Sequence, residues 1–418
     1  MQDAHDPYAA LRHRDYGLLL SSNVLAAMSG EIQFTVVEWE IFQRTNSYAM
    51  MGYAGLAQFL PLLILALPAG QAADYFSRKY LLMAAYVTMA LTSLGLALVS
   101  IYEGPVLLIF VFLALAGVSR ALGMPARSSL IPLVVGPEAL GNAVTWSSSG
   151  WQVAAVAGPA LGGLLAREPP LAYFLTVAGL LTCVGLAAQI KPRDAGRPPE
   201  PRSLGAFLAG IRFVWRTELL LAAITLDLFA VLLGGCTALL PAFCKEILFV
   251  GETSFGPEYA EAGFGALRAA PAVGAFVMAM LLAHRPPLKR PGRALLWSIV
   301  GFGLATIGFG LSNNVHLSFA MLFLTGAFDN ISVVIRGTLM QVLTPDEMRG
   351  RVAAVNSVFI SSTNQLGAFE SGITADWFGL QISVIGGGAA TILVVLAADL
   401  CWPKLRQLPP LHTLSNER

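Results

Sequence analysis

Charged residues are scarce in this chain of 418 residues, because Asp, Glu, Lys and Arg together make up only 12% of it. A soluble domain averages about 25%, since its surface has to be wetted. The net charge of +1 gives no basic excess, which argues against a nucleic-acid partner. Hydrophobic residues reach 56% and mean hydropathy is +0.67. The composition therefore indicates an integral membrane protein.

Cysteine and histidine are also few. The four Cys form no CxxC pair and the five His are scattered, so we expect no zinc site, no disulfide framework and no other metal centre. The motifs HExxH, GxSxG and GxxxxGK[ST] are missing, which argues against a hydrolase and against ATP as an energy source. No cofactor is expected. The N-terminus carries Arg12 and Arg14 without a cleavage site, so we predict no removable signal peptide.

Apolar stretches of about 20 residues, long enough to cross the hydrocarbon core, recur along the whole chain. Such long continuous runs differ from the alternating ten-residue pattern of a membrane barrel. The sequence predicts an all-α integral membrane protein with twelve transmembrane helices near 18–42, 48–73, 80–101, 105–127, 140–166, 170–190, 218–244, 260–284, 294–313, 317–342, 350–375 and 378–402.

Lys and Arg residues predict the orientation of these spans. Most of them fall in the loops on one side, whereas the loops on the other side hold only Arg44, Arg167 and Lys245. The positive-inside rule places the basic side, with both termini and the long middle loop, in the cytoplasm. We expect a multi-pass protein of the bacterial inner membrane.

The middle loop divides the chain evenly. Residues 191–202 are rich in Pro and charge, which is typical of a disordered linker. Apolar residues between Leu204 and Trp215 then recur at helical spacing, which predicts an amphipathic helix on the membrane surface or an extension of the seventh span. The predicted parts are an N-terminal six-helix bundle, a linker with this helix, a C-terminal six-helix bundle and a cytoplasmic tail, at 1–190, 191–217, 218–402 and 403–418.

The two halves resemble each other. Gly117 precedes Arg127 by ten residues, and Gly326 precedes Arg336 by ten. Pro61 lies thirteen residues before Asp74, as Pro271 does before His284, and Pro137-Glu138 is matched by Pro345-Asp346. Three matches in the same order predict two pseudo-symmetric bundles related by an axis along the membrane normal, as in rocking transporters.

Several motifs resemble the major facilitator superfamily. The segment from Gly70 through Asp74 to Arg78 and Lys79 is similar to its signature loop, with Tyr75 and Ser77 as departures. The fifth-span residues Gly158, Pro159, Gly162 and Gly163 resemble the motif of its antiporters, with Ala154 replacing one glycine. Residues 126–132, 210–213 and 345–352 look like the enterobactin-exporter group of drug and siderophore efflux proteins. The resemblance covers the whole chain and implies the major facilitator fold, but it does not identify the substrate.

The signature loop suggests a conformational latch. Asp74 can face the positive end of the eleventh helix and can also pair with Arg127. We expect Gly70, Asp74, Arg78, Lys79, Arg127, Arg349 and Arg351 to hold the outward-facing state and to separate as the bundles rock. The alternative is a charge cluster that only sets the orientation.

Ionisable residues inside the spans cost about 2.5–3.5 kcal/mol each, so each needs a reason. Glu31 in the first span is deepest and is our first choice as proton carrier or as counter-charge for a cationic substrate. Pairs across a cavity, such as Glu31–Arg120 or Arg120–Asp329, would offset each other's desolvation. Structural ion pairs are the alternative. The candidate substrate- and proton-binding residues are Glu31, Asp227, Arg120, Asp329, Glu370 and Arg336.

Small residues form a stripe on the fifth span, since Gly150, Ala154, Gly158 and Gly162 follow each other at four-residue spacing. Such a stripe permits a close helix contact, and Pro159 removes one backbone hydrogen bond. It is either a flexible seam that favours antiport or ordinary close packing.

The leading functional hypothesis is proton-coupled export of an amphiphilic small molecule, such as a drug or siderophore, by alternating access. Its partners are this substrate, protons and membrane lipids, and we expect a monomer. One alternative is uptake or flipping of a lipid-like solute without proton coupling. A membrane-embedded enzyme is a third hypothesis, disfavoured by the missing motifs.

Overall fold

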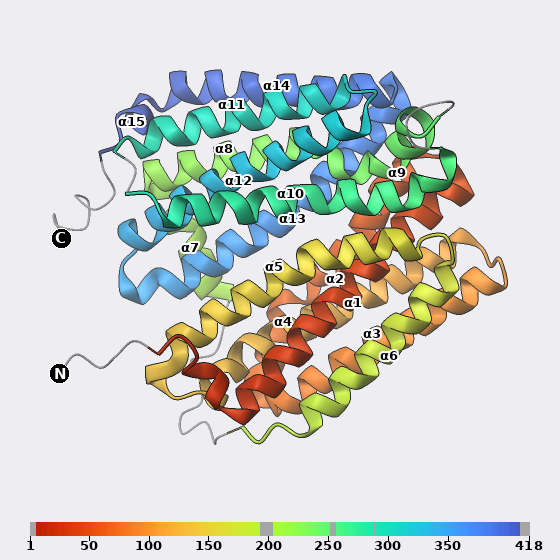
Figure 1. Cartoon of the computed structure of the whole chain (residues 1–418). Helices are drawn as coiled ribbons and strands as arrows, with labels where there is room; N and C mark the ends of the chain where they lie inside the picture. The colour runs from red at the N-terminus through yellow and green to blue at the C-terminus, as the bar shows by residue number, and fades with distance from the viewer. Residues whose placement is uncertain (1–5, 193–203, 251–255, 287–288, 410–418) are drawn as a thin grey trace. The chain divides into compact units, whose positions relative to one another are not determined.

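The computed structural model describes residues 6–192, 204–250, 256–286 and 289–409, and all regular elements in these ranges are helices (Figure 1). Nine helical segments in these ranges are long and apolar enough to cross a membrane. Three more helices, α1, α5 and α13, are 32, 26 and 33 residues long but more polar. At 1.5 Å per residue each exceeds the roughly 30 Å hydrocarbon core. The predicted all-α membrane fold is therefore confirmed.

The chain divides into two compact units. The first comprises Met1–Glu40 and Ala57–Arg202, and the second comprises Ile41–Leu56 and Ser203–Arg418. The C-terminal end of α1 and the N-terminal end of α2 thus group with the second unit. The first six long helices are α1 Arg14–Thr45, α2 Tyr48–Tyr75, α3 Arg78–Ile101, α4 Val106–Val134, α5 Leu140–Leu165 and α6 Pro169–Ala188.

The second unit continues after the linker, whose residues 193–203 lie outside the described ranges. Its seventh span is broken, because α8 is followed by a 3-10 turn, a short α-helix and a π-helix. Its elements are α7 Leu204–Arg216, α8 Glu218–Gly234, η3 Cys236–Leu239, α9 Leu240–Phe243, η4 Cys244–Leu248, η5 Pro257–Tyr259, α10 Ala260–Ala283, α11 Pro291–Gly310, α12 Val315–Leu343, α13 Asp346–Phe378, α14 Leu380–Cys401 and α15 Pro403–Arg406.

Glycines allow the closest helix contacts in both units. A Cβ atom at Gly117 on α4 would overlap the backbone carbonyl of Gln58 on α2. A Cβ atom at Gly326 on α12 would overlap the carbonyl of Pro271 on α10 in the same way. The sequence repeat pairs these two glycines, and each lets a helix approach its neighbour's backbone.

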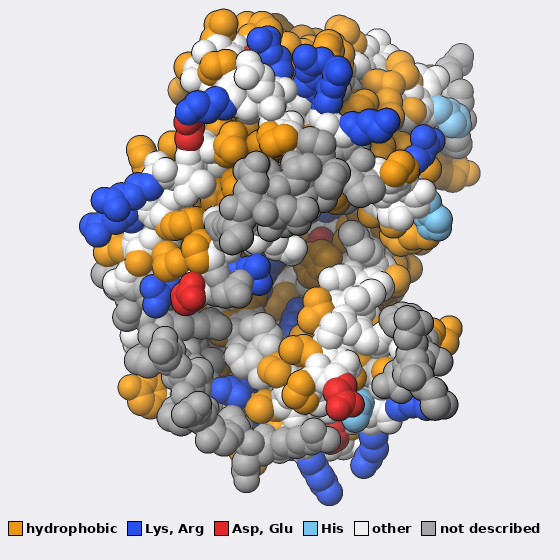
Figure 2. All heavy atoms as spheres, turned by 90° about the vertical axis from the view of Figure 1, so that its left-hand side faces the viewer, with side chains coloured by type: hydrophobic (Ala, Val, Ile, Leu, Met, Phe, Trp, Pro, Cys, Tyr) orange, Lys and Arg blue, Asp and Glu red, His pale blue; other side chains and the backbone are white. Residues whose placement is uncertain are grey.

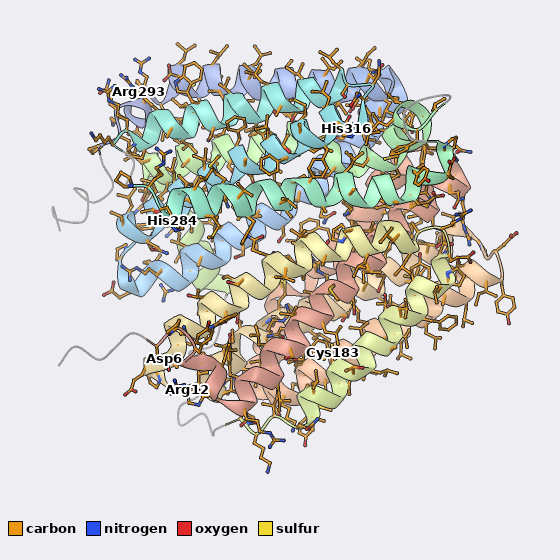
Figure 3. The ribbon with its side chains drawn as sticks, viewed as in Figure 1. Asp6, Arg12, Cys183, His284, Arg293 and His316 are labelled. Atoms are coloured by element: carbon orange, nitrogen blue, oxygen red, sulfur yellow. The ribbon has the colours of Figure 1, made fainter. Side chains whose placement is uncertain are left out.

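The core of the first unit is apolar with a few polar contacts. Tyr16, Leu82 and Leu130 are fully buried in it. Cys183 on α6 faces α1, where its thiol donates to the carbonyl of Ser22 at 3.3 Å (Figure 3). Cys183 is a free, buried cysteine.

The amphipathic segment after the linker forms α7. Its Val214 is buried together with Val352 and Val355 of α13. At Gly210 an added Cβ atom would lie 2.9 Å from the carbonyl oxygen of Arg351. The apolar side of α7 therefore covers α13, while Trp215 is exposed.

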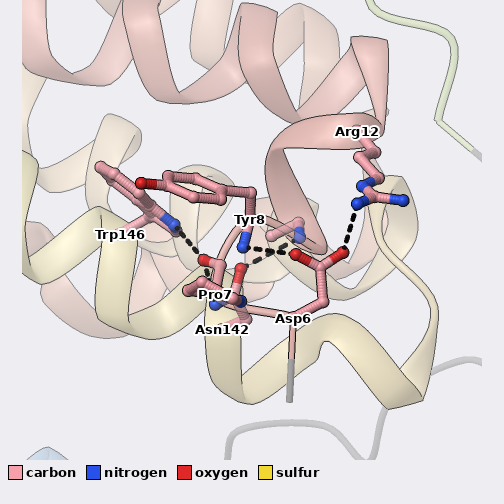
Figure 4. A network of polar contacts seen from close by, with 7 residues as sticks. Asp6, Pro7, Tyr8, Arg12, Asn142 and Trp146 are labelled. Atoms are coloured by element: carbon pink, nitrogen blue, oxygen red, sulfur yellow. Dashed lines mark hydrogen bonds and ion pairs between the residues drawn. The ribbon is translucent and has the colours of Figure 1, made fainter. Parts of the chain in front are cut away.

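The N-terminal segment is fastened to the start of α5 (Figure 4). Pro7 accepts hydrogen bonds through its carbonyl from Nδ2 of Asn142 at 2.8 Å and from Nε1 of Trp146 at 3.0 Å. Asp6 pairs with Arg12 at 2.9 Å and accepts from the backbone N–H of Tyr8. η1 Ala10–Arg12 follows directly, so the start of α1 is held against α5.

Candidate functional site

The first unit holds a polar cluster on α1, α2 and α4. Arg120 on α4 donates from Nη1 to Oε1 of Gln58 on α2 at 2.9 Å. Gln58 is buried, while the Arg120 side chain is solvent-accessible. Glu31 on α1 is half-buried and lies within electrostatic range of Arg120. The structure therefore brings together the predicted residues Glu31 and Arg120, and it adds Gln58, which the sequence analysis missed.

The sequence repeat contains a feature that points to Gln58. It lies three residues before Pro61, and Arg268 lies three residues before Pro271 in the matching segment. Each half therefore has a polar residue three positions before the proline of the repeat, although the repeat as described from the sequence does not include that residue.

The fifth helix packs closely on α1 beside this cluster. Added Cβ atoms at Gly158 and Gly162 would lie 2.5 Å from Cβ of Glu31 and 2.8 Å from Cβ of Thr35. Thr35 donates to the backbone carbonyl of Glu31 at 2.7 Å. The stripe of small residues thus fixes the position of Glu31, and side chains larger than hydrogen do not fit there. Pro159 and Gly163 are buried in the same helix.

A second polar layer of the first unit contains Asn23 and Tyr86. The Tyr86 hydroxyl on α3 donates to Oδ1 of Asn23 on α1 at 3.1 Å. Arg127 on α4 lies close enough to Tyr86 to interact with it electrostatically. Nε of Arg127 is buried without a hydrogen-bond partner among the described residues. Arg127 therefore lies beside the neutral Tyr86, and no ion pair joins it to a carboxylate of the described residues.

The matching layer of the second unit is a buried ion pair. Arg336 on α12 contacts Oδ2 of Asp227 on α8 through Nη1, and Ser332 donates to Oδ1 of Asp227 at 3.1 Å. Both charged side chains are buried, with relative accessibilities of 5% and 11%. The repeat places Asp227 where Asn23 lies and Arg336 where Arg127 lies. Both residues are candidates predicted from the sequence, and the structure pairs them.

The other candidate residues of the second unit are Asp329 and Glu370. Asp329 is seven residues before Arg336 on α12 and is half-buried. Glu370 on α13 is half-buried and accepts weakly from the hydroxyl of its neighbour Ser371 at 3.5 Å.

The signature loop joins α2 to α3. Gly70 and Asp74 lie in the last turns of α2, and the Asp74 side chain is outside the described part of the structure. Lys79 donates from Nζ to the carbonyls of Ala188 at 2.5 Å and Ile190 at 2.8 Å, at the end of α6. Its charge therefore offsets the negative end of the α6 dipole. Arg78 is half-buried at the first position of α3.

The basic residues of the latch on α13 lie in its first two turns. Arg349 is exposed, and Arg351 is half-buried with its Nη1 at 3.5 Å from Sδ of Met348. The latch itself stays a prediction.

The corner between the end of α1 and the start of α2 is a feature that no sequence motif predicts. Asp376, near the end of α13, accepts hydrogen bonds from the backbone N–H of Tyr48 at 3.1 Å and of Ala49 at 3.3 Å. These are first-turn donors of α2, so the Asp376 carboxylate caps that helix from another helix. The Tyr48 hydroxyl donates to Glu246 at 2.6 Å, and Lys245 donates to Oδ1 of Asn46 at 3.1 Å. These contacts explain why the corner groups with the second unit.

No group of three potential metal ligands occurs in the described ranges. Figure 3 shows that His284, at the end of α10, and His316, in the first turn of α12, lie at opposite ends of the second unit.

Residues 5–414 match the family model described as "Transmembrane secretion effector". The enterobactin exporter EntS of Shigella boydii serotype 18 is 28% identical over 420 residues, which cover 97% of this chain and 96% of that protein. EntS of Escherichia coli O1:K1 / APEC is 27% identical with the same coverage.

Solved structures share the fold at low sequence identity. A bacterial homologue of the human lysosomal transporter Spinster, in an inward-facing and occupied conformation, superposes with a TM-score of 0.71 at 16% identity, covering 97% of this chain and 100% of that one. A mutant form of the nucleoside transporter NupG gives a TM-score of 0.72 at 13% identity, covering 92% of this chain and 99% of that one.

Proposed function

Because the chain belongs to the transmembrane secretion effector family of the major facilitator superfamily, we propose that it exports an amphiphilic small molecule in exchange for protons. The family identifies a membrane transporter and not an enzyme, and the solved structures have the same fold. Its apolar helices and exporter relatives indicate a protein of the bacterial inner membrane. The relatives are named enterobactin exporters, which supports export and a siderophore-like or drug-like substrate.

The observation that carries this proposal is the cluster of Glu31, Arg120 and Gln58. A carboxyl group and a guanidinium in the middle of spanning helices are costly to insert, and residues of this kind mark ion and substrate pathways in membrane proteins. Arg120 is held by Gln58 at 2.9 Å and remains solvent-accessible, so a ligand can reach it. Glu31 is held by the contact of α1 with Gly158.

Exchange follows from competition at Glu31. Its carboxylate either binds a proton or serves as the counter-charge of a cationic group on the substrate, and it cannot do both at once. A proton that moves through 100 mV supplies about 2.3 kcal/mol. That free energy, together with the pH gradient, drives the substrate out.

The remaining candidates have supporting roles in this proposal. Asp329 and Glu370 are half-buried and contribute further polar groups to binding. Asp227 and Arg336 neutralise each other and stabilise the second unit. The closely packed seam of α5, formed by Gly158, Pro159, Gly162 and Gly163, favours antiport. Both termini lie in the cytoplasm. The protein acts as a monomer.

The latch of the signature loop controls alternation in this account. Replacing Asp74 by Asn removes its charge without a change in size, so we expect slower transport with an unchanged amount of protein in the membrane. The initial rate of efflux, normalised to protein abundance, measures this effect. An unchanged rate would leave the loop with the role of setting orientation.

Export itself is tested in an efflux-deficient bacterial host that expresses the chain. Resistance to a panel of cationic amphiphilic drugs and release of enterobactin are measured with and without an uncoupler. We expect resistance or release that the uncoupler abolishes. Export that persists after the proton gradient has collapsed would refute proton coupling.

A further inference from the structure

A cavity of about 190 Å³ lies at the ends of three helices of the first unit. It is lined by His13, Arg14 and Asp15 at the start of α1, Leu133 and Val134 at the end of α4, and Lys191 after α6. These are among the positions that the positive-inside rule assigns to the cytoplasmic surface. Figure 2 shows a face of the molecule on which Lys and Arg side chains are numerous.

The charge of this cavity is positive. Arg14 and Lys191 are exposed cations, and no carboxylate partner is found for either side chain among the described residues. Asp15 is the one carboxylate in the lining, and its Oδ1 accepts the backbone N–H of Lys191 at 3.3 Å. The C-terminal end of α6 would add partial negative charge, but Lys79 binds the carbonyls of Ala188 and Ile190 there.

The neighbouring Arg12 is neutralised within its own segment. Arg12 lies two residues before Arg14, and its guanidinium pairs with Asp6 at 2.9 Å (Figure 4). Arg12 does not line the cavity. Arg14 and Lys191 thus differ from Arg12 in having no carboxylate partner among the described residues.

We propose that this cavity binds the phosphate of an anionic phospholipid headgroup. Arg14 and Lys191 supply the charge, and His13 supplies a further hydrogen-bond donor. The buried Val134 and the half-buried Leu133 supply an apolar floor for the glycerol carbons. Basic residues at the cytoplasmic membrane surface attract anionic headgroups in this way. A bound headgroup would hold the inner ends of α1, α4 and α6 together.

The test compares two pairs of charge removals in the full-length protein. Arg14→Gln with Lys191→Gln removes the two cations of the cavity, and Arg12→Gln with Lys404→Gln removes two cations already paired with Asp6 and Glu218. Retention of phosphatidylglycerol against phosphatidylcholine is titrated by native mass spectrometry. One cation near the membrane surface is worth about fivefold in affinity, so the cavity pair should weaken phosphatidylglycerol binding at least about tenfold. The cations of the control pair lie outside the cavity and are already paired with carboxylates, so their removal should change binding less than about twofold.

Two further measurements keep the result interpretable. Arg14→Lys with Lys191→Arg keeps both charges and should retain binding, which separates loss of charge from loss of folding. Inorganic phosphate is added as a competitor to distinguish a free anion from a lipid. Equal losses in the cavity and control pairs, or displacement by inorganic phosphate without preference for phosphatidylglycerol over phosphatidylcholine, would overturn the proposal.

Discussion

Arg336 and Asp227 form a buried ion pair between α12 and α8, and the hydroxyl of Ser332 binds the same carboxylate at 3.1 Å. The matching positions of the first half are Arg127 and Asn23, so the first half lacks the negative member of the pair. The two halves thus have an arginine at the same position, but only the second half has a carboxylate at the other position. We expect the pair to be structural and Arg127 to be available to the latch.

Asp227→Asn leaves the charge of Arg336 buried without a counter-ion. Breaking one member of a buried pair costs about 3–5 kcal/mol, so the variant should melt well below the native protein in detergent. Glu218→Gln is the matched control on the same helix, because its pair with Lys404 is largely exposed and such pairs are worth about 0–1 kcal/mol. Equal melting temperatures for both variants would show that the buried pair contributes no more than a surface pair.

Gly158→Ala places a methyl group 2.5 Å from Cβ of Glu31, so α1 and α5 have to separate. Overpacking of this kind costs about 1–3 kcal/mol. Gly141→Ala, on the same helix, meets no atom within 4 Å and should leave stability unchanged or raise it slightly. Thermal unfolding and transport rate are measured for both variants. If Gly158→Ala behaves like Gly141→Ala, the seam is not closely packed in the working protein.

Asp376→Ala removes the cap from the first turn of α2. Losing an N-cap costs about 0.5–2 kcal/mol, so the amides of Tyr48 and Ala49 should exchange with deuterium several times faster. Asp376→Asn keeps an oxygen acceptor and should show a smaller change. Unaltered exchange at these amides in the alanine variant would mean that α2 does not depend on this cap.

The fold could be predicted from the sequence because hydrophobic length and basic loops are local signals. Each of the twelve predicted spans corresponds to a long helix or, for the seventh, to a broken one. The structure adds that Gly117 and Gly326, which the repeat pairs, both lie against the backbone of a neighbouring helix.

Contacts between distant residues were harder to predict. The sequence marks Asp227 and Arg336 as two candidates but does not predict the ion pair between them, because nothing in their spacing reveals that α8 and α12 bring them together. Gln58 was missed because an uncharged side chain in an apolar span carries no obvious cost. The cap by Asp376 depends on a contact between residues 328 positions apart, which no local pattern encodes.

Proton movement in proteoliposomes tests the central claim most directly. Purified protein is reconstituted with a pH-sensitive dye inside, and proton flux is recorded on addition of an exported substrate found in the host screen. We predict substrate-driven proton flux for the native chain and its loss in Glu31→Gln, because the amide can hold neither the proton nor the cationic group of the substrate. Flux of native size in Glu31→Gln would contradict the role of Glu31 as the site where proton and substrate compete.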